Sequence, residues 1–313
     1  MAQNHAAMKN SSLPTLLPKI MELQVSRMAH HVKLRIVTLF FCLNALIVFG
    51  LSFTLSAYSD DQLNPDQAFF TFDQKVSLVG RSYPIGIQAW YTGGLDFLSW
   101  GDPHTWKYGY FRAALNAASS GVVDRIGFEF QYFPLSIIGL SAGYDWGGRW
   151  YQPHFIDCSV YDCQGRLDSA YLKLQFAAAA HSLIVSGFIK YEELKHIGGL
   201  PQFYDESTLL PGQSRGEDVL TTNPTLLYSL SDRLNLGMTL LYSHGITSQS
   251  FSSLWGPVAQ YHFGKDAPGV ANSQVVFGLG EDQSTLVSPG FTLFAVWTMV
   301  IDPSLSIVDL KMR

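Results

Sequence analysis

The stretch DSAYLKLQFAAAAHSLIVSGFIKYEELK, residues 168–195, decides the fold because its apolar side chains recur with a period of two. A helix would give these residues no polar face of useful width. The alternation instead predicts two strands joined by a tight turn at His181-Ser182. One face carries Ala170, Leu172, Leu174, Phe176 and Ala178, then Leu183, Val185, Gly187, Ile189 and Tyr191; the other carries Ser169, Tyr171, Lys173 and Gln175, then Ser182, Ser186, Lys190 and Glu192.

The same alternation recurs to the end of the chain and predicts ten strands between residues 107 and 300. Two flanking segments, 76–92 and 304–311, extend this number. The sequence therefore predicts an all-β fold, an antiparallel transmembrane β-barrel of about 10 to 12 strands. Besides the opening pair, the alternating stretches are 108–117, 125–132, 134–146, 221–232, 234–245, 253–264, 272–280 and 290–300.

The composition points to a surface that does not face water alone. Only 14% of the 313 residues are charged, whereas 47% are hydrophobic, and soluble domains carry roughly a quarter charged residues. A net charge of −5 provides no basic footprint, so we expect no nucleic-acid partner.

The N-terminal part indicates export. Residues 36–57 are uncharged and apolar, follow Lys33 and Arg35, and end in small residues, as a secretory signal does. We therefore divide the chain into an N-terminal extension and signal peptide (1–57), a polar segment (58–75) and the barrel (76–313). A transmembrane anchor is the alternative for residues 36–57, and Met21 or Met28 is an alternative start.

Connections differ in length in the way that outer-membrane barrels require. Short turns such as 133–136 and 181–182 alternate with long loops at 147–168 and 195–218, so the short turns are assigned to the periplasmic side. The connection at 93–106 does not fit, because this polarity places a long segment among the short turns.

A soluble, secreted β-sandwich is the rival fold, and it predicts strand faces rich in Lys and Glu. Here the polar faces are mostly small and uncharged, and aromatic residues end many apolar faces, as in a membrane girdle. The chain thus resembles Gram-negative outer-membrane β-barrel proteins in general, although its end, VDLKMR, lacks their usual terminal aromatic. The girdle residues are Tyr132, Trp146, Tyr191, Tyr228, Tyr242, Trp255, Tyr261 and Trp297.

Beyond the expected signal, the chain holds two cysteines, Cys158 and Cys163. An even number in an exported chain predicts a disulfide. No second Cys or His pair lies at ligand spacing, so we expect neither a metal site nor a cofactor.

Five charged residues are predicted to form a cluster inside the barrel: Arg112, Arg125, Glu129, Lys173 and Lys190. A turn at Ser120-Gly121 predicts Arg112 opposite Glu129, and the turn at His181-Ser182 predicts Lys173 opposite Lys190. Two interpretations of the lysines stay open. A carboxylate such as Glu129 neutralises them, or they form a positive constriction that favours anions.

Enzyme function is the weaker hypothesis. Ser243-His244 is the best candidate for a lipid-modifying hydrolase, but a structural role is expected for it, as for His181 and His262. We expect no catalysis and favour a narrow channel for small solutes or a surface-interaction role through the long loops, where 150–155 and 201–204 are rich in aromatics. The expected partners are outer-membrane lipid and small solutes or extracellular ligands.

Overall fold

The computed structural model describes residues 70–101, 107–121, 123–150, 152, 156–264 and 273–302. Among them, no helix is long and apolar enough to cross a membrane. The predicted signal, the polar segment up to residue 69 and the 304–311 strand lie outside the described residues. The strands are β1 (Phe70–Ser82), β2 (Ile85–Gly101), β3 (Tyr108–Ser119), β4 (Val123–Leu135), β5 (Ile138–Arg149), β6 (Gly165–Ala180), β7 (Leu183–Ile197), β8 (Gln202–Asp205), β9 (Leu210–Gln213), β10 (Glu217–Thr222), β11 (Thr225–Ser229), β12 (Leu234–Gly245), β13 (Ser250–His262), β14 (Ser273–Ser284) and β15 (Gly290–Asp302).

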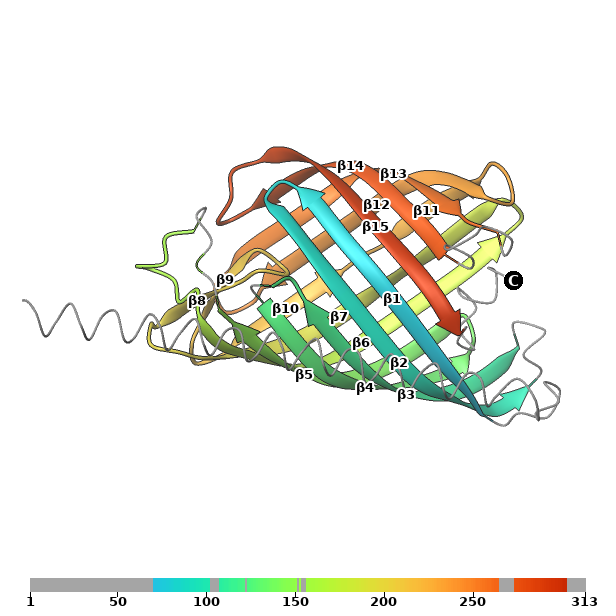
Figure 1. Cartoon of the computed structure of the whole chain (residues 1–313), viewed down its shortest axis with the longest axis horizontal. Coiled ribbons are helices and arrows are strands. Elements are labelled where there is room, and N and C mark those ends of the chain that lie inside the picture. Colours follow the sequence, from blue (N-terminus) through green and yellow to red (C-terminus); the bar gives the residue numbers. More distant parts are fainter. Residues whose placement is uncertain are drawn as a thin grey trace, which may run out of the picture. The chain divides into compact units, whose positions relative to one another are not determined.

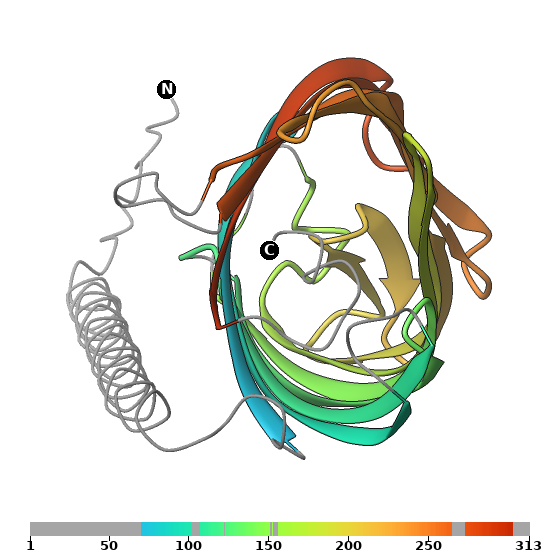
Figure 2. The same cartoon turned by 90° about the vertical axis from the view of Figure 1, so that its right-hand side faces the viewer.

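The long strands form one closed antiparallel barrel (Figures 1 and 2). Each strand pairs with its neighbour along the chain, and β1 pairs with β15, which closes the ring. β10 and β11 together occupy one position between β7 and β12. The described residues therefore provide twelve spanning positions, within the predicted range of about 10 to 12, but the prediction of one strand at 76–92 is wrong, because a turn at residues 83–84 divides this segment between β1 and β2. Closure leaves no unpaired edge, which is the condition for a sheet to cross a membrane.

A proline interrupts the span formed by β10 and β11, yet the register continues through it. Pro224 lacks an N–H, so it cannot donate to the carbonyl of Leu240, although its own carbonyl accepts a bond from the Leu240 N–H at 3.1 Å. The side-chain amide of Asn223 donates to that Leu240 oxygen instead, at 2.9 Å. Gly187 lies beside the interruption, where a Cβ would stand 2.5 Å from the Asn223 oxygen.

The hairpin that decided the fold is present with the predicted register. β6 and β7 pair from Arg166–Ile197 to Ala180–Leu183, with His181 in the left-handed region at φ 53°. The 93–106 connection no longer conflicts with the polarity, because β2 continues through Gly101. β1, which pairs with β2, starts at Phe70, whereas the sequence predicts that the barrel starts at residue 76.

The two ends of the barrel differ. The long-loop end carries the connections 150–164 and 198–216, and the short-turn end carries 136–137, 181–182 and 230–233. β8 and β9 lie at the long-loop end (Figure 1). They form a separate two-stranded sheet that turns into the ring in Figure 2.

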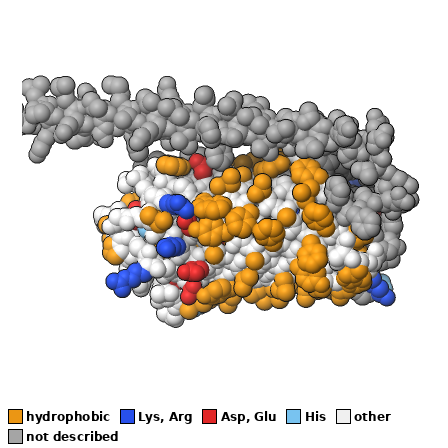
Figure 3. Space-filling model, turned by 90° about the horizontal axis from the view of Figure 1, so that it is seen from below, with side chains coloured by type: hydrophobic (Ala, Val, Ile, Leu, Met, Phe, Trp, Pro, Cys, Tyr) orange, Lys and Arg blue, Asp and Glu red, His pale blue; other side chains and the backbone are white. Residues whose placement is uncertain are grey.

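The outer wall is apolar and exposed. Leu172 is 63% exposed and Phe130 is 61% exposed in the middle of their strands, and Figure 3 shows hydrophobic side chains spread across one face of this wall. A wall of this kind faces lipid rather than water. The soluble β-sandwich is therefore wrong, since the sheet closes on itself and the central part of its outward face is apolar. The exposed girdle residues on this wall are Tyr132, Trp146, Tyr191, Tyr228, Tyr242, Trp255 and Tyr261.

Replacing Asn223 tests how strictly the sheet requires a hydrogen bond for each backbone group. Asn223→Ala should lower the free energy of unfolding in phospholipid vesicles by about 1–3 kcal/mol, because it leaves the Leu240 carbonyl unpaired. Urea titration followed by tryptophan fluorescence measures the change. Asn116→Ala is the matched control, since among the described residues the Asn116 side chain accepts a bond only from the Thr92 hydroxyl. Equal losses in the two variants would contradict the role given to Asn223.

Candidate functional site

The inner wall is polar along one continuous line of paired residues. Starting on β2, the strand pairings place inward side chains directly opposite one another across most of the barrel, and several of them carry charge. Charges in such a position need partners, since water has limited access to them. The line consists of Asp96, Arg112, Gln131, Ser141, Lys173, Lys190, Thr221, Ser243 and Ser252.

Two lysine–glutamate pairs lie at the middle of this line. Lys173 stands opposite Lys190, as the sequence predicts, and each ammonium has its own carboxylate. Nζ of Lys173 lies 2.6 Å from Oε1 of Glu129, and Nζ of Lys190 lies 2.6 Å from Oε2 of Glu192. The Tyr171 ring lies 5.9 and 5.5 Å from the two ammonium groups. One of the two interpretations from the sequence is that Glu129 neutralises the lysines, and Glu129 is indeed the carboxylate paired with Lys173.

A glycine makes room for the Tyr171 ring. A Cβ on Gly143 would stand 2.4 Å from the ring carbon that bears the hydroxyl and from the hydroxyl oxygen itself. Any larger residue there would displace the ring from its place beside the lysines.

The predicted Arg112–Glu129 pair is wrong. Ser119 pairs with Asp124, so the turn centres one residue later than expected and Arg112 stands opposite Gln131. Its guanidinium instead binds Asp73 on β1, at 2.6 and 2.8 Å.

Arg112 also reaches a second carboxylate. Its Nε lies 3.3 Å from Oδ1 of Asp96 on β2, so one cation joins β1, β2 and β3. Gly94 provides the space, since a Cβ there would stand 2.6 Å from the Asp73 carboxylate. Both carboxylates of this group are buried.

The last cluster residue, Arg125, binds the segment inside the barrel. Its guanidinium donates to Oδ1 of Asp205 on β8 at 2.6 Å. Phe203 and Leu210, on β8 and β9, pack with inward residues of the wall in one apolar core. We call residues 198–216 the plug, because an ion pair and an apolar core hold them against the inner wall at the long-loop end. The wall residues of this core are Leu167, Leu194 and Val219.

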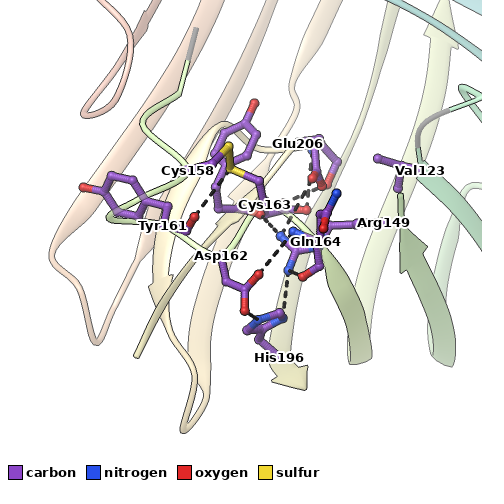
Figure 4. A network of polar contacts seen from close by, with 12 residues as sticks. Val123, Arg149, Cys158, Tyr161, Asp162, Cys163, Gln164, His196 and Glu206 are labelled. Atoms are coloured by element: carbon purple, nitrogen blue, oxygen red, sulfur yellow. Dashed lines mark hydrogen bonds and ion pairs between the residues drawn. A yellow bond between two sulfur atoms is a disulfide. The ribbon is translucent and has the colours of Figure 1, made fainter. Parts of the chain in front are cut away.

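A polar network fastens the plug to the neighbouring loop (Figure 4). The buried Arg149 donates to the carbonyl of Tyr204 in the plug at 2.5 Å and to that of Gln164 at 3.1 Å. Asp162 accepts bonds from the backbone N–H groups of Gly199 and Leu200 at 2.6 and 3.2 Å. Loop and plug are thus bound to each other as well as to the wall.

The predicted disulfide is confirmed. Cys158 and Cys163 are bonded, and Cys163 packs with Ile156, Tyr204 and Leu209. The disulfide therefore joins a core that includes the plug. Tyr204 comes from the aromatic stretch 201–204, which is packed inside the barrel; most of 150–155 lies outside the described residues.

The proposed hydrolase pair is not assembled. Ser243 and His244 are consecutive in β12 and point to opposite faces of the sheet. The Ser243 hydroxyl lies 3.0 Å from that of Thr221 inside the barrel, whereas Nδ1 of His244 lies 3.0 Å from the carbonyl oxygen of Ser250. The described residues contain no group of three or more His, Cys, Asp or Glu that could hold a metal ion.

Sequence reasoning missed four charged residues of the inner wall and the plug. Asp73, Asp96, Arg149 and Asp205 all bind partners far away in the chain, and their one local signal is a charge at an inward position of a strand or in a long polar loop. The spacing 205–208, D-E-S-T, did carry a signal: Asp205 caps the following turn through the N–H and hydroxyl of Thr208, at 3.0 and 2.6 Å.

No protein-family model matches the chain, and no curated protein matches it. Among solved structures, an outer membrane channel from Pseudomonas putida F1 is 10% identical over 77% of this chain and 100% of its own length, with a TM-score of 0.42. The NanC porin is 11% identical over 72% and 98%, with a TM-score of 0.37. The translocator domain of the autotransporter NalP from Neisseria meningitidis is 13% identical over 82% and 96%, with a TM-score of 0.35. Similarity this distant gives no information about substrate.

Glu206 makes the plug sensitive to pH. Burial raises the pKa of its carboxyl to about 7, against the attraction of Arg149, whose Nη1 lies 3.8 Å from Oε1 of Glu206. Asp205 and Arg125 face it as well, and Arg81 donates to its backbone carbonyl at 3.2 Å.

The folded plug therefore holds a proton that the opened plug releases, so the free energy of opening should fall as the pH rises from about 4.5 to about 7. Hydrogen exchange of the amides of 203–210, corrected for the intrinsic exchange rate, measures it. Asp205 does not produce this trend, because Arg125 holds the pKa of that carboxyl below its ordinary value. Glu206→Gln should remove the dependence in this window; a dependence unchanged in that variant would assign it to another group.

Proposed function

We propose that this chain is an outer-membrane β-barrel that conducts small solutes through a narrow, charged bore, with the plug as its gate at the long-loop end. The observation that supports it is the contrast between the two faces of one closed sheet. The outer wall exposes large apolar side chains such as Leu172 and Phe130, whereas the inner wall carries Arg112, Lys173 and Lys190 with their carboxylates. Outer-membrane lipid is then the partner of the outer wall.

The width of the barrel suits a narrow passage. About eight strands give an interior that side chains just fill, and 16 or more leave an open aqueous channel. Twelve spanning positions lie between these limits. The ionic side chains of the inner wall keep such an interior wet. A barrel without a passage would not need charged side chains there.

Surface interaction through the long loops is the other class that the sequence left open. The plug fits it poorly, because its large side chains are not presented outward: Phe203 and Tyr204 are fully buried. A catalytic role finds no support in the Ser243-His244 arrangement.

The gate consists of contacts between loop and wall, among which the Arg125–Asp205 pair is nearly buried on both sides.

Planar-bilayer recording of the refolded full chain tests the proposal. The protein should pass a small ionic current, and Arg125→Met should raise the open fraction by roughly tenfold or more, because it leaves Asp205 as an unpaired buried charge. Arg166→Met is the control, since the Arg166–Asp168 pair at the same end of the barrel is on the outer wall and the Arg166 side chain is half exposed.

A barrel that is folded, as judged by its resistance to unfolding in detergent, and that passes no current in either form would overturn the channel. Equal currents in wild type and Arg125→Met would overturn the plug as its gate.

A further inference from the structure

We propose that the middle of the bore holds a binding site for small organic anions with an apolar body, such as aromatic or branched aliphatic carboxylates. This inference deepens the proposed channel function and rests on it. The site has two walls of different chemistry, the lysine wall on β6 and β7 and an apolar wall on β15 and β1.

The lysine wall presents its ammonium groups to the bore. In each lysine–glutamate pair the carboxylate is the more buried partner. The side chain of Lys173 is 19% exposed against 7% for Glu129, and that of Lys190 is 23% exposed against 3% for Glu192. A solute in the bore therefore meets the two ammonium groups first. An anionic group can accept hydrogen bonds from both, since the lysines stand directly opposite each other.

The apolar wall lies across the bore from these lysines. In the closed order of twelve positions, β15 is six positions from β6, and β1 is six positions from β7. The pairings Val276–Val296 and Val79–Val296 place three valines side by side on the inner face. Val296 lies at the middle of β15, as Lys173 and Lys190 do in their strands, and its two neighbours Val276 and Val79 are each the fourth residue from an end of theirs.

Phe294 adds an aromatic ring to this wall. It lies against Gly278 of β14, where a Cβ would stand 2.1 Å from the ring. Val258 pairs with Gly278 and extends the patch onto β13. Among these residues Val79, Val276, Phe294 and Val296 are only partly buried, so the bore reaches their side chains. Apolar side chains facing a wet bore are costly unless a solute covers them.

The two walls together select for a solute that has both features. An apolar body gains from covering Phe294 and the valines, and its anionic group gains from the lysine ammonium groups. Acetate has the charge without the body, and benzylammonium has a similar body with the opposite charge. Benzoate has both and should bind most tightly.

Titration calorimetry on the full-length barrel in detergent tests the site without requiring conduction. Benzoate should bind about tenfold or more tightly than acetate and than benzylammonium. Phe294→Ser and the more conservative Val296→Thr should weaken benzoate and leave acetate unchanged. Lys173→Gln combined with Lys190→Gln should remove the preference of benzoate over benzylammonium. Phe291→Ser, on the outward face of the same strand and 78% exposed, is the control and should change neither.

Current measurements separate this inference from the channel itself. Benzoate should also block the potassium chloride current at concentrations near its dissociation constant. Benzoate binding no tighter than that of acetate, with a normal current, would overturn the site and keep the channel. Tight, Phe294-dependent binding without any current would keep the site and overturn the channel.

Discussion

The structure depends on one constraint, that every backbone N–H and C=O group at membrane depth must find its partner within the sheet. Pairing of β1 with β15 meets it by closing the ring. The Asn223 side chain shows how strictly this constraint applies, since the side chain supplies the one hydrogen bond that Pro224 cannot make in the β10–β11 span. Because side chains alternate along each paired strand, closure also separates an apolar outside from a polar inside.

The inner wall carries charged side chains that need partners, and these partners come from distant segments of the chain. Arg112 joins three strands through Asp73 and Asp96, and Lys173 joins β6 to Glu129 on β4. Glycines at 94 and 143 leave the space in which these groups meet. Removing one member of such a group leaves a buried charge without a partner, which costs about 3–5 kcal/mol.

The sequence predicts what local pattern determines. The sequence predicts the period of two, the register of the β6–β7 hairpin and the disulfide, because each depends on residues close together in the chain. The Arg112–Glu129 pair failed because a turn centred one residue later shifts every opposed pair by two.

The plug was not predictable for a different reason. Its strands are four residues long, too short to show alternation, and its anchor joins Arg125 to a residue 80 positions away. No local pattern encodes a contact of that kind. The interruption at Pro224 was likewise hidden, because the register passes through it unchanged and the apolar pattern of 221–232 reads as one strand.

The central claim is that one closed sheet faces lipid on one side and a wet, charged bore on the other, and single cysteines along β6 test it most directly. With Cys42 replaced by serine and the native disulfide intact, cysteines at 171, 172, 173, 174 and 175 are introduced one at a time and the barrel is refolded into vesicles. We expect a water-soluble thiol reagent to label positions 171, 173 and 175, and a fluorophore at 172 or 174 to be quenched by a lipid-bound quencher. Water-soluble labelling at all five positions, with no quenching from lipid, would contradict the account.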